Sequence, residues 1–278
     1  MAGRVEGKVA FVTGAAQGQG RSHAVELARE GADVIAVDIC EQIPGMPYPT
    51  GTWEKLQETV REVEALDRRI VAAKADVRDY DTLTAAVDEG VAQLGRLDIV
   101  AANAGIGSLP HASHELPLDV WQQMIDVNLT GVWQTCKAAI PHILAGGQGG
   151  AIALTSSAAG LQAYSHISHY VSAKHGVVGL MRTLAVEYGP ERIRVNSIHP
   201  TQVETDMIMN DETMKVFVPD IPNPTRADFE PRSQAMHTLP IPWVQPIDIS
   251  RALVFLVSDD ARYITGVPLP VDAGALVK

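Results

Sequence analysis

The sequence predicts an α/β fold in which one doubly wound parallel sheet of about seven strands carries helices on both faces. The first observation is that short apolar runs alternate with longer amphipathic segments along the chain. The second is that these runs are nearly continuous in Val, Ile and Ala, which is typical of parallel strands covered on both faces. The runs expected to form strands are 8–13, 33–38, 70–76, 98–103, 151–156, 193–198 and 267–271.

The domain organisation follows from length and periodicity. Helices are expected at 21–30, 119–145 and 169–188. The whole chain, 1–278, is assigned to a single domain, since 46% of its residues are hydrophobic and can form one large core. Two insertions break the alternation: about 39–53, with three prolines, and about 206–245, rich in Met and Pro without clear periodicity. Insertions of this length are usually functional, so the second is expected to be a substrate lid.

Composition argues against several classes of partner. The formal net charge is −11 and no run of Lys or Arg occurs, so neither nucleic acid nor an anionic membrane surface is an expected partner. Cys40 and Cys136 are too few for a disulfide framework and are expected to be reduced thiols. No signal peptide or membrane-spanning stretch is recognised, which favours a cytoplasmic protein. No metal site is expected, because the histidines lack metal-ligand spacing with carboxylates. The histidines considered are His166, His169, His175 and His199.

A glycine-rich turn follows the first predicted strand and leads into the first predicted helix. It reads TGAAQGQG and contains Gly14, Gly18 and Gly20. Gln17 directly precedes Gly18, and Gln19 lies between Gly18 and Gly20. The first glycine permits a tight turn, the second a close approach to a pyrophosphate, and the third close packing of helix on strand. The N-terminus of the helix then presents free N–H groups to the phosphates. An ordinary strand-to-helix turn is the alternative.

Residues at the ends of the next strands favour a dinucleotide site. Asp38 ends the second strand, where a carboxylate can accept hydrogen bonds from the adenosine ribose and repel a 2′-phosphate. Gln17 and Ile39 lie at neighbouring positions and neither is basic, so the sequence predicts NAD rather than NADP. An aspartate that only caps the next loop is the alternative. Further residues expected at this site, after the third and fourth strands, are Asp76, Val77, Asn103, Ala104 and Gly105.

Ser157, Tyr170 and Lys174 are the candidate catalytic residues. Ser157 follows the fifth predicted strand, and Tyr170 and Lys174, four residues apart, share one face of a helix. Taken alone, the pair would indicate a packed tyrosine beside a solvated lysine. Beside a dinucleotide turn the three indicate hydride transfer, because a nearby ammonium lowers the pKa of a tyrosine toward the range of a general base.

With these residues in place, the chain resembles the short-chain dehydrogenase/reductase family, whose members have a Rossmann-type fold. The resemblance extends over about residues 8–274. The motifs that carry it are TGAAQGQG at 13–20, ANAG at 102–105, Asn128, Ser157, and YVSAK at 170–174. It implies Tyr170 as general base or acid, Ser157 on the substrate oxygen, and Lys174 on the nicotinamide ribose.

The resemblance also implies roles that the residues alone do not indicate. Asn128 matches the family residue that anchors a water for proton relay. Val203 and Thr205 match positions that hold the nicotinamide carboxamide. The family further implies a homotetramer, with the helices that carry Asn128 and Tyr170 at one interface.

Three features are similar to the carveol-dehydrogenase-like, mycofactocin-associated branch of the family. They are the insertion after Asp38, HPTQVET at 199–205, and YVSAKHGVVGLMR from residue 170. In that branch NAD stays bound through turnover and passes electrons to a separate redox partner, so this chain is expected to hold its cofactor in the same way. Ala102 and Gln19 depart from the family pattern, but neither removes a group that the reaction needs.

Three functions remain open at this point. The leading hypothesis is an NAD-linked oxidoreductase of a hydrophobic secondary alcohol or ketone, cyclic and terpenoid-like by resemblance, because the second insertion is rich in adaptable Met. Those Met residues would otherwise only pack on the core. The second hypothesis is a freely exchanging 3-oxoacyl-carrier reductase, for which Arg226 and Arg232 are thin support. The third is an NAD-binding redox sensor without catalysis.

Two interpretations of the first insertion are left open. It either covers the adenosine or is a plain surface loop.

Overall fold

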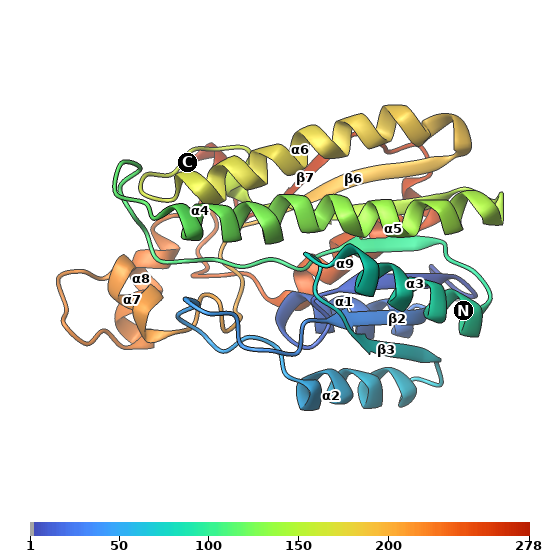
Figure 1. Ribbon diagram of the computed structural model, residues 1–278. Coiled ribbons are helices and arrows are strands. Elements are labelled where there is room, and N and C mark those ends of the chain that lie inside the picture. The colour runs from blue at the N-terminus through green and yellow to red at the C-terminus, as the bar shows by residue number, and fades with distance from the viewer. Residues whose placement is uncertain (1–2) are drawn as a thin grey trace.

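The computed structural model describes residues 3–278, which form one parallel sheet between two layers of helices (Figure 1). The sheet has seven strands in the order β3-β2-β1-β4-β5-β6-β7. They are β1 (Val9–Thr13), β2 (Asp33–Asp38), β3 (Ile70–Lys74), β4 (Ile99–Ala102), β5 (Gly150–Thr155), β6 (Ile193–Pro200) and β7 (Pro268–Val271). The predicted fold class is confirmed, and every strand begins and ends within two residues of its predicted bounds.

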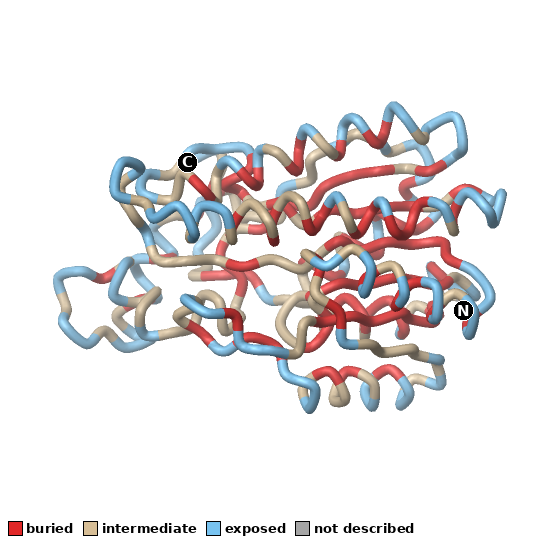
Figure 2. Tube along the Cα trace, in the orientation of Figure 1, coloured by how far each residue is buried: buried red, intermediate tan, exposed pale blue. Residues whose placement is uncertain are grey.

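Side chains of each central strand alternate between two buried cores, one on each face of the sheet. In β1, Val9 and Phe11 belong to one core, and Ala10 and Val12 belong to the other. Because successive strand side chains point to opposite faces, a continuous apolar run is needed when both faces are covered. Figure 2 shows the result, with the strands buried along most of their length and the exposed residues on the outer helices and loops.

The helices are α1 (Gly18–Arg29), α2 (Trp53–Glu64), α3 (Tyr80–Leu94), α4 (Leu118–Ile125), α5 (Gly131–Gly146), α6 (Ser168–Tyr188), α7 (Asp211–Phe217), α8 (Arg226–Gln234) and α9 (Pro246–Val257). Helices α1, α2 and α9 pack on one face of the sheet, and α3, α5 and α6 pack on the other. Among the residues described, none of these helices combines the length and apolar character that crossing a bilayer requires.

The long helix predicted at 119–145 is interrupted in the structure. A π-helical segment, Asp126–Thr130, separates α4 from α5. There the N–H of Gly131 donates to the carbonyl of Asp126, five residues back, so the turn holds one extra residue. The apolar pattern on either side stays close to the helical period, which is why the sequence predicted a single helix. Asn128 lies in this segment and is completely buried.

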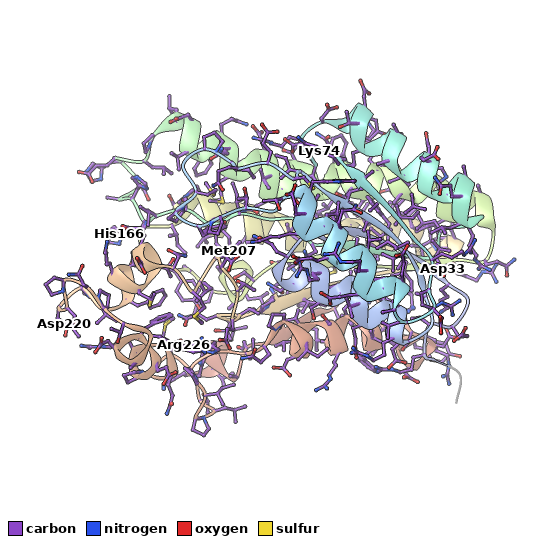
Figure 3. All side chains as sticks on the ribbon, turned by 90° about the horizontal axis from the view of Figure 1, so that it is seen from below. Asp33, Lys74, His166, Met207, Asp220 and Arg226 are labelled. Carbon is purple, nitrogen blue, oxygen red and sulfur yellow. The ribbon has the colours of Figure 1, made fainter. Side chains whose placement is uncertain are left out.

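Both insertions lie beyond the carboxyl ends of the strands. The first runs without helix or strand until α2 begins at Trp53. The second contains α7 and α8, and it has a small apolar cluster of its own around Phe229 and Trp243. In Figure 3, Met207 and Arg226 of this second insertion lie toward the opposite end of the molecule from Asp33, which begins β2.

Candidate active site

A cleft opens at the carboxyl ends of the strands, where the strand order reverses between β1 and β4. Most of the predicted cofactor residues line it: Gly14, Gln17, Gly18, Gln19, Gly20, Asp38, Ile39, Asp76, Val77, Asn103, Ala104, Gly105 and Thr205. Val203, Tyr170 and Lys174 are outside this lining; Val203 is buried and pairs with Val244 in an isolated bridge. The structure therefore brings together residues that the sequence separates by almost two hundred positions.

The glycine-rich turn needs its glycines for backbone conformation and for space. Gly14 and Gly18 have φ angles of +69° and +55°, in the left-handed region that glycine adopts without strain. A Cβ atom on Gly20 would lie 1.9 Å from the Gly14 carbonyl oxygen. Helix α1 begins at Gly18, three residues before its predicted start, and no side chain caps its first N–H groups. These N–H groups and the positive end of the helix dipole can therefore bind an anion such as a pyrophosphate.

Asp38 is held at the end of β2 by its own backbone surroundings. Its Oδ2 accepts the Ala16 N–H at 3.0 Å, and its Oδ1 accepts the Cys40 N–H at 3.0 Å. Burial raises the pKa of Asp38, while these N–H groups and Lys55 oppose the rise. A Cβ on Gly51 would lie 2.4 Å from Oδ1, so glycine at that position lets the first insertion pass beside the carboxylate.

Ser157, Tyr170 and Lys174 meet at the edge of this cleft. The Lys174 Nζ lies 5.6 Å from the centroid of the Tyr170 ring and donates to the Thr155 carbonyl at 2.9 Å. Gly105 lines the dinucleotide cleft and also lies beside the candidate catalytic residues, because a Cβ on Gly105 would lie 3.5 Å from Lys174 Nζ. Helix α6 presents the tyrosine and the lysine from consecutive turns, as their four-residue spacing predicted.

The ionisation of these groups is dominated by burial. Burial raises the pKa of Tyr170, and a hydrogen bond with Ser157 opposes that rise. Burial also lowers the pKa of Lys174 to about 8. Lys174 is not among the groups that shift the pKa of Tyr170 in the protein alone. That Lys174 together with a positively charged nicotinamide favours the phenolate stays a prediction. In this structure the lowering contribution comes from Ser157.

Asn128 also lies beside Gly105. A Cβ on Gly105 would lie 2.9 Å from the Asn128 Oδ1. That oxygen accepts the Ile106 N–H at 2.9 Å, and the Asn128 Nδ2 donates to the Ile106 carbonyl at 2.8 Å. The side chain therefore fixes the loop after β4 against the π-helical segment. The predicted water relay at Asn128 remains a prediction.

The sequence pattern assigns none of the remaining lining residues individually to the site, although it allows each insertion to cover it. Several come from the first insertion: Ile43, Tyr48, Thr50 and Gly51. Tyr48 is 6% exposed, and its hydroxyl accepts the N–H of Gly107 at 2.8 Å. Met207 of the second insertion also lines the cleft. The only signal for these positions was that each lies in a segment that breaks the strand–helix alternation.

Comparison with known proteins agrees with this geometry. The family model described as short chain dehydrogenase matches residues 8–215. The chain belongs to the short-chain dehydrogenase family. The predicted resemblance to this family and the predicted enzyme class, a dehydrogenase, are confirmed, and the link to mycofactocin stays a prediction.

Individual short-chain dehydrogenases match over almost their full length. The chain is 61% identical to (−)-trans-carveol dehydrogenase of Rhodococcus erythropolis over 275 residues, which cover 99% of each protein. It is 36% identical to cyclohexanol dehydrogenase of an Acinetobacter species over 98% of this chain and 96% of that protein. The crystal structure of carveol dehydrogenase from Mycobacterium avium in complex with NAD is 61% identical, has a TM-score of 0.98, and is matched over 99% of this chain and 100% of its own.

Proposed function

We propose that this short-chain dehydrogenase transfers a hydride between NAD and a hydrophobic cyclic secondary alcohol or ketone, with Tyr170 as general base or acid. The convergence of Ser157, Tyr170 and Lys174 beside Gly105 carries the proposal, since Gly105 belongs to the wall of the dinucleotide cleft. A serine, a phenol and an ammonium at one point supply the groups that alcohol oxidation requires.

NAD is the cofactor that the cleft fits. Asp38 presents a carboxylate at the end of β2, which suits ribose hydroxyls and disfavours a 2′-phosphate. The solved carveol dehydrogenase of Mycobacterium avium and a 44% identical short-chain dehydrogenase of Mycobacterium paratuberculosis, with a TM-score of 0.91 over 99% of this chain and 100% of that chain, both have NAD bound. When bound, NAD supplies the hydride acceptor.

The proposed chemistry divides between three side chains. Ser157 Oγ accepts the Ala159 N–H at 3.1 Å, and its hydroxyl, which bonds to Tyr170 in the protein alone, would donate to the oxygen of a bound substrate. Tyr170 takes the hydroxyl proton of the alcohol as the hydride leaves the carbon. Lys174 is held by the Thr155 carbonyl near the Gly105 wall, where it can bind the ribose and stabilise the phenolate.

A hydrophobic substrate is supported by the side chains near the reacting end of the cleft. Ile106, Val127 and Met207 line the cleft, and Ile106 is bonded to Asn128, which lies beside Gly105. The named relatives act on carveol and on cyclohexanol, which are both cyclic secondary alcohols. The second insertion would then serve as the substrate lid, with Met207 reaching the cleft.

We also propose that the first insertion retains the cofactor. It is tied across the cleft at two points, Tyr48 to Gly107 and Pro49 to Gln17 at 3.0 Å. Directly after it, Lys55 of α2 donates to Asp206 at 3.2 Å. A dinucleotide beneath these contacts could leave only if they broke. Retained NAD would need a separate redox partner to reoxidise it.

The test is to desalt the purified protein exhaustively, denature it, and assay the supernatant for NAD. Stoichiometric NAD, with cyclohexanol oxidised only when an electron-accepting dye is present, is the expected result. Empty protein that oxidises cyclohexanol with added NAD would refute retention and keep the dehydrogenase. Protein that oxidises no secondary alcohol under either condition would contradict the proposed function.

The other hypotheses receive less support. Arg226 pairs with Glu204 and Arg232 pairs with Asp220, so neither arginine is free to form a basic patch for an acyl carrier. A redox sensor would not need a complete set of Ser157, Tyr170 and Lys174.

The homotetramer implied by the family is part of the proposal. Exposed apolar side chains lie on the helices expected at an interface: Trp121 on α4, Trp133 on α5 and Val186 on α6, which are 36%, 44% and 80% exposed. Light scattering on the purified protein should give four times the chain mass.

The cytoplasmic location is likewise still a prediction. Cys40 and Cys136 are both free cysteines.

A further inference from the structure

His199 is a completely buried polar residue that contacts the catalytic serine from behind. It lies near the end of β6, and its ring bridges two oxygens. The Nδ1 atom lies 2.7 Å from the carbonyl oxygen of Ser157, and the Nε2 atom lies 2.8 Å from the hydroxyl of Ser197. We infer that His199 is a positioning residue that holds Ser157 against Tyr170 through the Ser157 carbonyl, an inference that rests on the proposed function.

The contacts and the lowered pKa of the ring together leave one protonation state. A carbonyl oxygen has no hydrogen to donate, so the Nδ1 atom must carry the hydrogen that joins it to Ser157. Burial, with Lys174 as a further cause, lowers the pKa of His199 to about 4, so the ring is neutral near pH 7. The Nε2 atom then carries no hydrogen and accepts the Ser197 hydroxyl. The side chain is therefore a fixed Nδ1–H donor aimed at Ser157.

The end of β5 is held from two sides. From α6, the Lys174 Nζ donates to the Thr155 carbonyl, and the Ser156 hydroxyl donates to the Lys174 carbonyl at 2.9 Å. From β6, His199 donates to the Ser157 carbonyl, which also accepts the Gly160 N–H at 2.8 Å. Tyr170 and Lys174 come from α6, whereas Ser157 lies in the loop that follows β5. The contact from β6 therefore sets where the serine hydroxyl lies relative to the phenol.

Positioning at this point matters more for the chemical step than for binding. A displacement of about 1 Å between reacting groups can lower a rate by roughly a hundredfold. His199 contacts the backbone of Ser157 and not the cleft lining, so its loss should leave NAD binding and alcohol binding nearly unchanged. A residue that only filled space would lower stability without a selective loss in kcat.

The chain offers a matched control in His23. This histidine is 1% exposed, and its Nδ1 atom lies 2.8 Å from the Ser250 hydroxyl, between α1 and α9. It bonds to no member of the catalytic set. His23→Ala should therefore reproduce the cost of removing a buried imidazole without the positioning effect.

The experiment compares His199→Ala, His199→Asn and His23→Ala with the wild type. Oxidation of cyclohexanol is measured with added NAD or dye, together with bound NAD and thermal unfolding. We expect His199→Ala to lower kcat about tenfold or more, with KM within about threefold of the wild type. Asparagine can place an amide N–H near the position of Nδ1, so His199→Asn should stay within about threefold of the wild-type kcat. His23→Ala should lower the unfolding temperature and keep kcat.

A second readout is independent of turnover and of the alanine variant. With ¹⁵N-labelled histidine, NMR at pH 7 should show an Nδ1–H signal that is missing from His199→Asn. The Nδ1–H signals of other rings whose Nδ1 atom faces a carbonyl oxygen, such as that of His237, should remain in the variant. Three results would overturn the inference. The first is a His199 ring in the Nε2–H form, and the second is a folded His199→Ala variant with the wild-type kcat. The third is a His199→Asn variant whose kcat is as low as that of His199→Ala. If the wild type oxidises no alcohol, the proposed function fails, and the NMR signal decides the contact by itself.

Discussion

The reactivity of Tyr170 is decided by the groups around its hydroxyl. Burial raises its pKa, and the hydrogen bond with Ser157 is the contribution that lowers it. Lys174, itself with a pKa lowered to about 8 by burial, lies 5.6 Å from the ring centroid. A base of this kind becomes more effective as the pH rises, so alcohol oxidation should be faster in alkaline solution.

Tyr170→Phe should lower kcat by about a thousandfold, because it removes the only proton acceptor proposed for the alcohol. Bound NAD should be unchanged, since Lys174 and the glycine-rich turn remain. Turnover and NAD content are measured on the same preparation. Tyr263→Phe is the control, because Tyr263 is 89% exposed and distant in sequence from the site. Residual activity close to wild type in Tyr170→Phe would contradict the assigned role.

Two buried histidines should make stability depend on pH. Burial lowers the pKa of His23 to about 3 and that of His199 to about 4. Unfolded histidine titrates near about 6.5, so below that pH the unfolded chain binds protons that the native state excludes. The native state is then fully stabilised above about pH 6.5, and it loses up to roughly 1.4 kcal/mol per pH unit for each group as the pH falls toward the folded pKa values.

Urea unfolding at pH 7 and pH 5 checks this dependence. The free energy of unfolding should be lower at pH 5, and His23→Asn should remove part of the difference. Equal values at both pH values would show that these rings are not kept neutral by the fold.

The first insertion acts as a strap over the cleft at the scale of an element. Residues 39–52 contain no helix or strand, yet Tyr48 and Thr50 are buried, and the Thr50 hydroxyl donates to the Glu41 carbonyl at 2.7 Å. Its contacts reach the glycine-rich turn, the loop after β4, and α4, where Gln123 donates to the Pro44 carbonyl at 3.3 Å. An irregular segment is ordered in this way because its polar groups find partners on several neighbouring elements.

Tyr48→Phe should speed the release of NAD by about five- to tenfold, because a hydrogen bond of this kind contributes about 1 kcal/mol. The substitution keeps the ring and leaves the Gly107 N–H without its acceptor. To measure release, the protein is loaded with reduced NAD, a trap for the free cofactor is added, and the loss of the bound cofactor's fluorescence is recorded over time. An unchanged release rate would show that the strap does not limit cofactor exit.

The whole molecule is built from two sheet cores and a separate lid cluster. Phe11 lies in the core shared with α3, α5 and α6, whereas Phe229 lies between Phe217 and Trp243, with ring centroids 5.2 Å and 5.7 Å away. Both phenylalanines are fully buried. The lid cluster is linked to the rest through Glu204, which pairs with Arg226 and accepts the Trp243 Nε1–H at 3.0 Å.

Phe11→Ala and Phe229→Ala should therefore have different effects. Removing either ring costs about 3–5 kcal/mol locally. Phe11→Ala should lower the free energy of unfolding of the whole chain by that amount. Phe229→Ala should mainly loosen α7 and α8, raise KM for the alcohol, and increase hydrogen exchange in the lid. Equal losses of global stability would show that the lid unfolds together with the sheet.

Local pattern was enough to predict much of this protein. The order of strands and helices follows from apolar runs, the glycine-rich turn from Gly14, Gly18 and Gly20, and the shared face of Tyr170 and Lys174 from helical spacing. Each of these depends on neighbours within a few residues, where backbone geometry alone relates sequence to structure.

Only the tertiary structure decided the contacts between distant segments. Nothing local places Tyr48 on Gly107, or His199 behind Ser157, since each pair is joined across different elements. The extra residue at Asn128 was equally hidden, because a π-helical turn changes hydrogen bonding without changing the apolar pattern around it. Periodicity records which face of an element is buried, whereas the partner of a buried polar group is settled only when the elements pack.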